Sequence, residues 1–332
     1  MFIKMKKCIM AVLFLLPFFW ACPVTAQDAP VKNKYGMKLI HNDDGSYSVD
    51  KKTRRILKGE QPEGLLEPYS SLPAVTKKMV EGVEPVEVVY KKYKNRKLKL
   101  YICEAEDADR PVPVLFMVHG GGWFGGSATT TIMRYAKYFS MVGGVTTVNV
   151  EYSLAGEEGV TIETVMKELE DAVKYVRKNA RKYHLDMSRI GFIGSSAGGQ
   201  LATMTGFATQ GTKVIVGWVG AYDLLDMLEY WSGAKNKKLT EYFHRADPEV
   251  LRKYSPVYNV PTDRKLAVAT FYGSGDTAVN YEQAEHLCDA LRAAGHKVAQ
   301  EFYPYYSHGL VYGSDKKYEI LNKTLVFLKE NL

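Results

Sequence analysis

Cysteine is scarce in this sequence of 332 residues, which contains only four. Cys8 and Cys22 lie in the apolar amino-terminal stretch, and Cys103 and Cys288 are the two that remain beyond it. These two allow at most one disulfide bond, and the sequence does not tell how far apart they lie. Cysteine pairs and histidine clusters with the spacing of a structural metal site are also lacking. A disulfide-rich scaffold is therefore excluded, and we expect neither a metal ion nor a cofactor.

Apolar runs long enough to cross a membrane are lacking as well. The run from Cys8 to Cys22 is shorter than the roughly 20 residues that a spanning helix needs, and it contains Pro17. Three lysines precede it and a small-residue site ending at Ala26 follows it, which is the order of a secretory signal peptide. We therefore expect residues 1–26 to be removed and the mature protein to be secreted or periplasmic, without stable membrane insertion. Lipidation at Cys22 is the alternative, but the residues before it fit a lipid-attachment motif poorly.

A large excess of one charge is also absent. The formal net charge of +7 falls to about +4 when residues 1–26 leave with their three lysines. So small an excess does not indicate a nucleic-acid partner. The densest basic run, residues 91–99, lies between apolar stretches at 86–90 and 98–103, which predict two strands joined by a turn at Asn95. A β-hairpin explains this run better than a phosphate-binding surface does.

Beyond the signal peptide the chain divides into a polar arm and one large domain. Residues 27–84 contain several turn signals and no clear periodicity, so we expect an extended, partly ordered arm. From residue 85 to 332, continuous apolar runs of strand length alternate with helical patterns, which predicts an α/β fold with a mostly parallel central sheet and helices on both faces. The predicted strands of this sheet are 112–118, 145–152, 189–194, 213–220, 266–273 and 297–303, and the predicted helices are 161–182, 197–209, 281–294 and 318–330.

A glycine-rich turn joins one predicted strand to the helix after it. Residues 194–198, Gly-Ser-Ser-Ala-Gly, match the Gly-x-Ser-x-Gly elbow, in which small residues let strand and helix pass closely. Ser196 is the middle residue, and we expect a strained backbone there that presents its hydroxyl outward at a helix N-terminus. Ser195 would point elsewhere. The structural alternative is a Gly/Ser-rich helix cap without chemistry.

Nucleophilic chemistry at Ser196 needs a base and an acid, and the sequence offers both at strand ends. Asp276 follows the strand 266–273, and His308 follows the strand 297–303. The order Ser196, Asp276, His308 is typical of α/β-hydrolases and of no other serine-triad fold. Asp223 is the rival acid, although we expect it to cap or position the segment that follows it.

A run of glycines follows the strand 112–118, where this fold carries its oxyanion loop. Residues 119–126, His-Gly-Gly-Gly-Trp-Phe-Gly-Gly, are called the glycine loop below. We expect the backbone N–H groups of Gly121, Gly122 and Ala197 to stabilise an oxyanion. His119 is predicted to brace the loop and not to act as a base. Neither the Rossmann spacing nor the lysine of a P-loop is present, which argues against phosphate binding.

With these motifs, the chain from about Val86 to Leu332 resembles the α/β-hydrolase superfamily. It is most similar to His-Gly-Gly-Gly esterases and lipases of the hormone-sensitive-lipase type, and to secreted esterases that remove acetyl or feruloyl groups from plant polysaccharides. The stretch "VEYSLAGE", 150–157, resembles the Asp-Tyr-Arg-Leu-Ala-Pro-Glu stretch of the former, with Glu151, Ser153 and Gly156 as departures. Kynurenine formamidases share a His-Gly-Gly-x-Trp loop, but the expected export argues against their intracellular reaction. The resemblance implies a serine carboxylic-ester hydrolase.

Aromatic residues are the candidate substrate contacts. They do not distinguish between several classes of substrate. Trp123 in the glycine loop and Trp231 in the segment 223–265, a possible cap, are predicted to contact the substrate, although such side chains also serve to pack a cap. We expect a small-molecule or polysaccharide ester, with an acetyl or feruloyl-type acyl group. A general carboxylesterase or lipase and a serine peptidase of the prolyl-oligopeptidase type are the alternatives, and a non-catalytic binding protein would require the loss of a triad residue.

Overall fold

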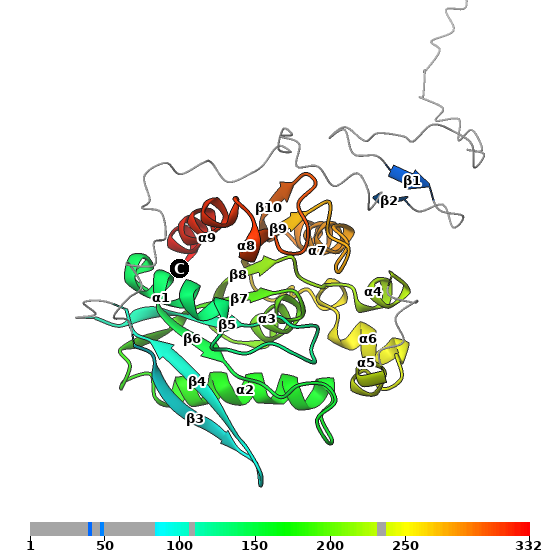
Figure 1. Ribbon diagram of the computed structural model, residues 1–332. Helices are drawn as coiled ribbons and strands as arrows, with labels where there is room; N and C mark the ends of the chain where they lie inside the picture. The colour runs from blue at the N-terminus through cyan, green and yellow to red at the C-terminus, as the bar shows by residue number, and fades with distance from the viewer. Residues whose placement is uncertain (1–38, 42–46, 50–83, 106–109, 231–236) are drawn as a thin grey trace, which may run out of the picture.

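The central sheet has eight strands, six of which are parallel. The computed structural model describes residues 39–41, 47–49, 84–105, 110–230 and 237–332 (Figure 1). The order of the strands in the sheet is β10-β9-β8-β7-β5-β6-β4-β3, and the first six run parallel to one another. The predicted α/β fold with a mostly parallel sheet is therefore confirmed. The parallel strands are β5 (Val112–Val118), β6 (Thr146–Val150), β7 (Leu185–Ser195), β8 (Thr212–Trp218), β9 (Ala267–Gly273) and β10 (Lys297–Tyr303).

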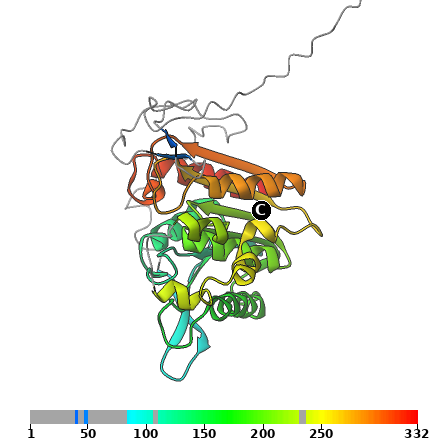
Figure 2. The ribbon, with the colours of Figure 1, turned by 90° about the vertical axis from the view of Figure 1, so that its right-hand side faces the viewer.

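The basic run forms the predicted hairpin. β3 (Val86–Lys92) pairs antiparallel with β4 (Lys97–Cys103), and the Tyr93 N–H donates to the Arg96 carbonyl across the turn, at 2.8 Å. β4 also pairs antiparallel with β6, so the hairpin extends the sheet at the end opposite β10. In both views of the ribbon the hairpin projects beyond the body of the molecule (Figures 1 and 2).

Helices cover both faces of the sheet because alternate residues of its strands point to opposite sides. In β5, Val114 and Phe116 belong to one buried cluster and Leu115 and Met117 to the other. The first cluster includes residues of α2 (Ile162–Lys178), α3 (Ala197–Ala208) and α7 (Glu282–Ala293), and the second includes residues of α1 (Thr131–Gly143) and α9 (Lys317–Asn331).

The possible cap, residues 223–265, contains several short helices. These are α4 (Leu224–Tyr230), α5 (Lys237–Tyr242), α6 (Pro248–Tyr254) and a 3₁₀ turn at Pro256–Tyr258. Another short helix, α8 (Leu310–Gly313), lies between β10 and α9.

The expected signal peptide, 1–26, lies outside the described residues, as does most of the polar arm. Within the arm, β1 (Leu39–His41) and β2 (Tyr47–Val49) form a separate antiparallel pair. No helix in the part of the chain that the structure describes is long and apolar enough to cross a membrane.

Candidate active site

The elbow is a sharp turn between β7 and α3. β7 ends at Ser195 and α3 begins at Ala197, so Ser196 alone joins them, with φ 55° and ψ −125°. This left-handed φ is the strained conformation that the sequence predicted. The glycines are required by close approach: a Cβ on Gly194 would lie 2.0 Å from the Gly198 carbonyl oxygen. The turn therefore projects Ser196 away from both elements.

Three predicted site residues meet in one chain of hydrogen bonds. His308 Nε2 lies 3.0 Å from Ser196 Oγ, and His308 Nδ1 lies 2.6 Å from Asp276 Oδ2. The other carboxylate oxygen of Asp276 accepts from the backbone N–H groups of Ala278 and Val279 at 2.8 and 2.9 Å. Because these bonds fix the carboxylate, the imidazole is oriented with its free nitrogen toward the serine hydroxyl.

Ser195 takes no part in this chain of hydrogen bonds. Ser195 is 1% exposed, and β-strand alternation directs its side chain to the same side as Ile193, toward the layer of α1 and α9. The geometry therefore distinguishes the two adjacent serines and favours Ser196 as the nucleophile.

Asp223, the rival acid, has the capping position that the sequence favoured for it. Its Oδ1 accepts from the backbone N–H groups of Leu225 and Asp226 at 3.1 and 3.3 Å, at the start of α4. Its Oδ2 accepts from the Tyr258 hydroxyl at 3.0 Å. The carboxylate on His308 belongs to Asp276 instead.

His119 braces the glycine loop, as predicted. His119 is 4% exposed, and its ring stacks on Tyr152 with 4.2 Å between the centroids. His119 Nδ1 lies 2.8 Å from the Gly120 carbonyl oxygen, to which it donates. Burial lowers the pKa of His119 to about 4, so the ring is neutral at pH 7.

The glycine loop lies directly against the elbow. A Cβ on Gly120 would lie 2.7 Å from the Ser195 carbonyl oxygen and 3.1 Å from Ser196 Cβ. The first of these distances is too short for a real Cβ, so this glycine, which the sequence did not single out, is required by close approach. Gly121 and Gly122 follow with φ of 127° and 60°, values that favour glycine. Ala197 is the first residue of α3, where backbone N–H groups lack partners within the helix. The expected oxyanion donors therefore come from the two elements that flank Ser196, and their role stays a prediction.

Trp123 is a packing residue, which corrects the expected substrate contact. It is 2% exposed, its indole N–H donates to Gln200 Oε1 at 3.0 Å, and its ring lies edge-on to Phe243 at 5.2 Å. The exposed aromatic residue of the loop is its neighbour Phe124, which is 40% exposed. A Cβ on Gly122 would lie 2.9 Å from the ring of Phe124, so this ring lies against Gly122.

Most described aromatic residues of the possible cap are also buried. Tyr258 is the large exposed one, at 47%. Trp231, the second expected substrate contact, lies outside the described residues. Tyr242, Phe243 and Tyr254 therefore pack the possible cap, which is the alternative to a substrate contact.

The structure adds no metal ligands and no disulfide bond to this site. Among the described residues, no three His, Cys, Asp or Glu side chains are grouped so that they could hold a metal ion. Cys103 and Cys288 are free and buried. Burial raises the pKa of the Cys288 thiol to about 11, which makes it a poor nucleophile.

Comparison with known proteins identifies the family. A family model described as BD-FAE matches residues 98–291, more than half of the chain. The chain belongs to the BD-FAE family. The BD-FAE match includes the glycine loop, Ser196 and Asp276, and it ends before His308.

Relatives of this BD-FAE member include an esterase and another hydrolase. Esterase LipC of Mycobacterium tuberculosis is 26% identical over 207 residues, which are 55% of this chain and 49% of LipC. A protein of Acanthamoeba polyphaga mimivirus, described as an alpha/beta hydrolase, is 37% identical over 99 residues, 30% of this chain and 28% of that protein. The chain thus matches half or less of the length of these curated relatives.

A solved esterase shares the fold. The propionate-bound structure of the thermophilic esterase Est2 from Thermogutta terrifontis aligns with a TM-score of 0.60 and 23% sequence identity, over 76% of this chain and 93% of that one. The BD-FAE member described here therefore has the α/β-hydrolase fold.

Proposed function

We propose that the protein is an exported serine esterase that hydrolyses short acyl esters through a covalent intermediate on Ser196. One observation carries the proposal: His308 bridges Ser196 Oγ and the Asp276 carboxylate. A serine hydroxyl is a weak nucleophile, and a histidine held in this way is the base that activates it.

The hydrogen-bond geometry fits a two-step hydrolysis. His308 Nε2 accepts the proton of Ser196 Oγ as the oxygen attacks the ester carbonyl, and the same proton passes to the leaving alcohol. Water then attacks the acyl-enzyme, giving its proton to His308, and the acid leaves as Ser196 Oγ regains that proton. Asp276 accepts from Nδ1–H throughout and stabilises the imidazolium.

Both steps place negative charge on the carbonyl oxygen. In the proposal, the N–H groups of Gly121, Gly122 and Ala197 receive this charge. One such donor is typically worth about a hundredfold to a thousandfold in kcat.

For the substrate, we propose an acetyl or feruloyl-type ester on a carbohydrate outside the cytoplasm. Three observations support this choice. The expected signal peptide predicts export. Phe124 and Tyr258 are exposed aromatic side chains, of the kind that contact sugars and aromatic acyl groups, and Tyr258 has Arg252 over its ring, 5.6 Å from the centroid. The Est2 structures hold propionate or butyrate, which are short acyl groups.

The nucleophile is tested with nitrophenyl acetate and two neighbouring variants. Ser196→Ala removes the attacking oxygen and should lower kcat by about a million-fold, because the triad acts as a unit. Ser195→Ala is the matched control and should lower kcat far less. Equal behaviour of the two variants, or full activity of Ser196→Ala, would refute the assignment.

The substrate is tested by specificity constants. Acetylated xylo-oligosaccharides should exceed nitrophenyl acetate in kcat/KM if the acyl group is acetyl, because contacts with the remote sugars lower the barrier at the acyl centre. If the acyl group is of the feruloyl type, methyl ferulate should exceed nitrophenyl acetate through contacts of its aromatic ring. Phe124→Ala should reduce the ratio of kcat/KM for the preferred substrate to kcat/KM for nitrophenyl acetate. A clear preference for long-chain acyl esters would refute the proposed carbohydrate substrate, and it would not contradict the proposed esterase mechanism.

A further inference from the structure

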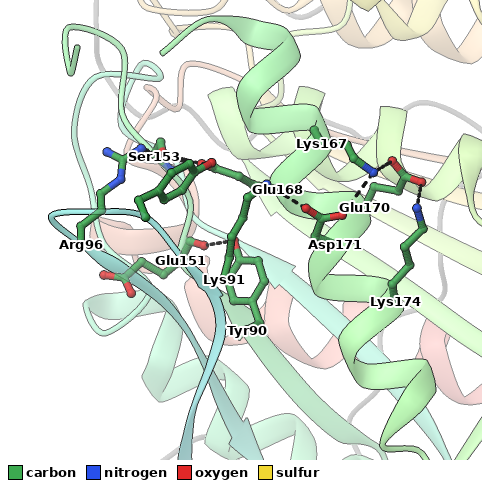
Figure 3. Close-up of polar contacts among 11 residues, drawn as sticks. Tyr90, Lys91, Arg96, Glu151, Ser153, Lys167, Glu168, Glu170, Asp171 and Lys174 are labelled. Carbon is green, nitrogen blue, oxygen red and sulfur yellow. Dashed lines mark hydrogen bonds and ion pairs between the residues drawn. The ribbon is translucent and has the colours of Figure 1, made fainter. Parts of the chain in front are cut away.

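A buried carboxylate joins three elements at the end of the sheet opposite β10. Glu168 of α2 is 0% exposed (Figure 3). Its Oε1 accepts from the Tyr93 hydroxyl of the β3–β4 turn at 2.6 Å and from Ser153 Oγ at 2.5 Å, and its Oε2 accepts from the Ser153 backbone N–H at 2.8 Å. A buried carboxylate is costly unless it is paired and hydrogen-bonded. Loss of these hydrogen bonds would therefore leave the Glu168 carboxylate uncompensated, so these bonds stabilise the arrangement.

Arg96 supplies the opposite charge from the hairpin. Its Nη2 donates to Ser153 Oγ and lies 3.8 Å from Glu168 Oε1, while its Nη1 pairs with the carboxylate of Glu157. The guanidinium also lies over the ring of Tyr93, 4.7 Å from its centroid. Ser153 occupies the position of the arginine in the Asp-Tyr-Arg-Leu-Ala-Pro-Glu stretch that residues 150–157 resemble. In this protein the guanidinium of Arg96, from the β3–β4 turn, lies beside Ser153 instead.

These contacts hold the segment 151–157, which follows β6. The other side of this segment contacts the glycine loop. The Tyr152 hydroxyl donates to the His119 carbonyl at 2.7 Å, and the Ala155 N–H donates to the Trp123 carbonyl at 2.9 Å. Ser153 lies between these two donors in the sequence, so its attachment to Glu168 and Arg96 fixes both.

We propose that Arg96 and Glu168 are positioning residues for the glycine loop, which they hold in place against Ser196 through the segment 151–157. The proposal rests on the proposed esterase function. Neither residue touches the reacting atoms. Their effect is expected in the turnover step because oxyanion donors act only when aligned with the transition state, and a shift of about 1 Å in a positioned group can cost about a hundredfold in rate.

The kinetic test uses two variants and a control at the same interface. Arg96→Ala and Glu168→Gln should lower kcat for nitrophenyl acetate by about tenfold to a hundredfold, with KM changed by less than about twofold. Arg96→Lys keeps the charge and should recover part of the loss. Lys91→Ala is the control, because Lys91 Nζ pairs with Asp171 Oδ2 at 2.7 Å and so joins the same hairpin to α2. Neither this ion pair nor the contact of Lys91 Nζ with the Tyr93 ring, 5.5 Å from its centroid, involves the segment 151–157. Lys91→Ala should leave kcat near the wild-type value.

Hydrogen–deuterium exchange supplies a readout that does not need activity. The backbone amides of 119–126 should exchange faster in Arg96→Ala and as in wild type in Lys91→Ala. The proposal is overturned if amide exchange in the glycine loop of Arg96→Ala is unchanged from wild type, or if Lys91→Ala changes kcat and exchange as Arg96→Ala does. It is also overturned if kcat falls only together with faster amide exchange throughout the protein. If Arg96→Ala does not fold, Arg96→Lys and Glu168→Gln decide between these outcomes. A wild-type protein that hydrolyses no ester would refute the proposed function, while the exchange comparison would still decide the positioning role.

Discussion

Ser196 combines a strained backbone with a hydroxyl aimed at His308. A non-glycine residue at φ 55° costs about 1 to 3 kcal/mol, and such strain persists where the surroundings leave no alternative. Here the two backbones approach so closely that a Cβ on Gly194 would lie 2.0 Å from the Gly198 carbonyl oxygen. Local sequence was sufficient to predict this conformation, because the strand, the turn and the helix are consecutive.

The acid of the triad gives a prediction at this scale. Asp276→Asn should preserve the fold and lower kcat for nitrophenyl acetate by about ten-thousandfold, because the amide cannot stabilise the imidazolium or hold the required tautomer. Asp223→Asn is the control, since Asp223 caps α4 and bonds to Tyr258. A larger loss in Asp223→Asn would transfer the acid role to that residue.

Trp123 shows where prediction at the residue scale fails. Its place in the glycine loop favoured a substrate contact, whereas Gln200 and Phe243 hold it in the core. These partners are distant in the sequence, so their contact with Trp123 leaves no local signal. Neighbouring Phe124 has the exposure that was expected of Trp123.

At the scale of elements, buried strands were the easiest to predict. β5 and β10 have the predicted bounds, because apolar runs covered on both faces stand out from their surroundings. α1 was missed. Its start has no side-chain cap and no acidic residue in its first turn, although Ile132, Tyr135, Ala136 and Phe139 have helical spacing and are buried.

The glycine loop gives a prediction about pH. In the unfolded chain His119 binds a proton near its ordinary pKa of 6.5, whereas in the folded protein it stays neutral down to about pH 4. Lowering the pH from about 6.5 to 4 therefore favours the unfolded state, by about 3 kcal/mol. In His119→Asn the free energy of unfolding should lose this part of its dependence on pH. Denaturant unfolding between pH 7 and 4 measures it.

The control for this measurement is a histidine outside the loop. The side chain of His286 is 45% exposed, so His286→Asn should keep the wild-type decline. An equally steep decline in His119→Asn would show that the buried imidazole is not its source.

At the scale of the whole molecule, the sheet order brings the site together. β5, β7, β9 and β10 deliver the glycine loop, Ser196, Asp276 and His308 to one edge, since parallel strands share the side at which they end. This was predictable from chain order. The cluster of Arg96, Ser153 and Glu168 was not, because it depends on a hairpin, a loop and a helix meeting in space.

Export gives a prediction for the chain as a whole. When the full-length chain is made in a secreting bacterium, the mature protein should begin at Gln27, as measured by intact mass and amino-terminal sequencing. Cys22→Ser should be processed identically. A mature chain that begins at a lipid-modified Cys22 would establish the lipoprotein alternative.

The two buried free cysteines have a practical consequence for labelling. In a chain that begins at Gln27, Cys103 and Cys288 are the only native thiols, both are 0% exposed, and burial raises the pKa of each. Thiolates are the species that react with maleimides, so neither thiol competes for such a reagent in the folded protein. A single cysteine introduced at an exposed position, such as Lys94 in the hairpin turn, would therefore carry a fluorophore at one known place without removal of a native cysteine.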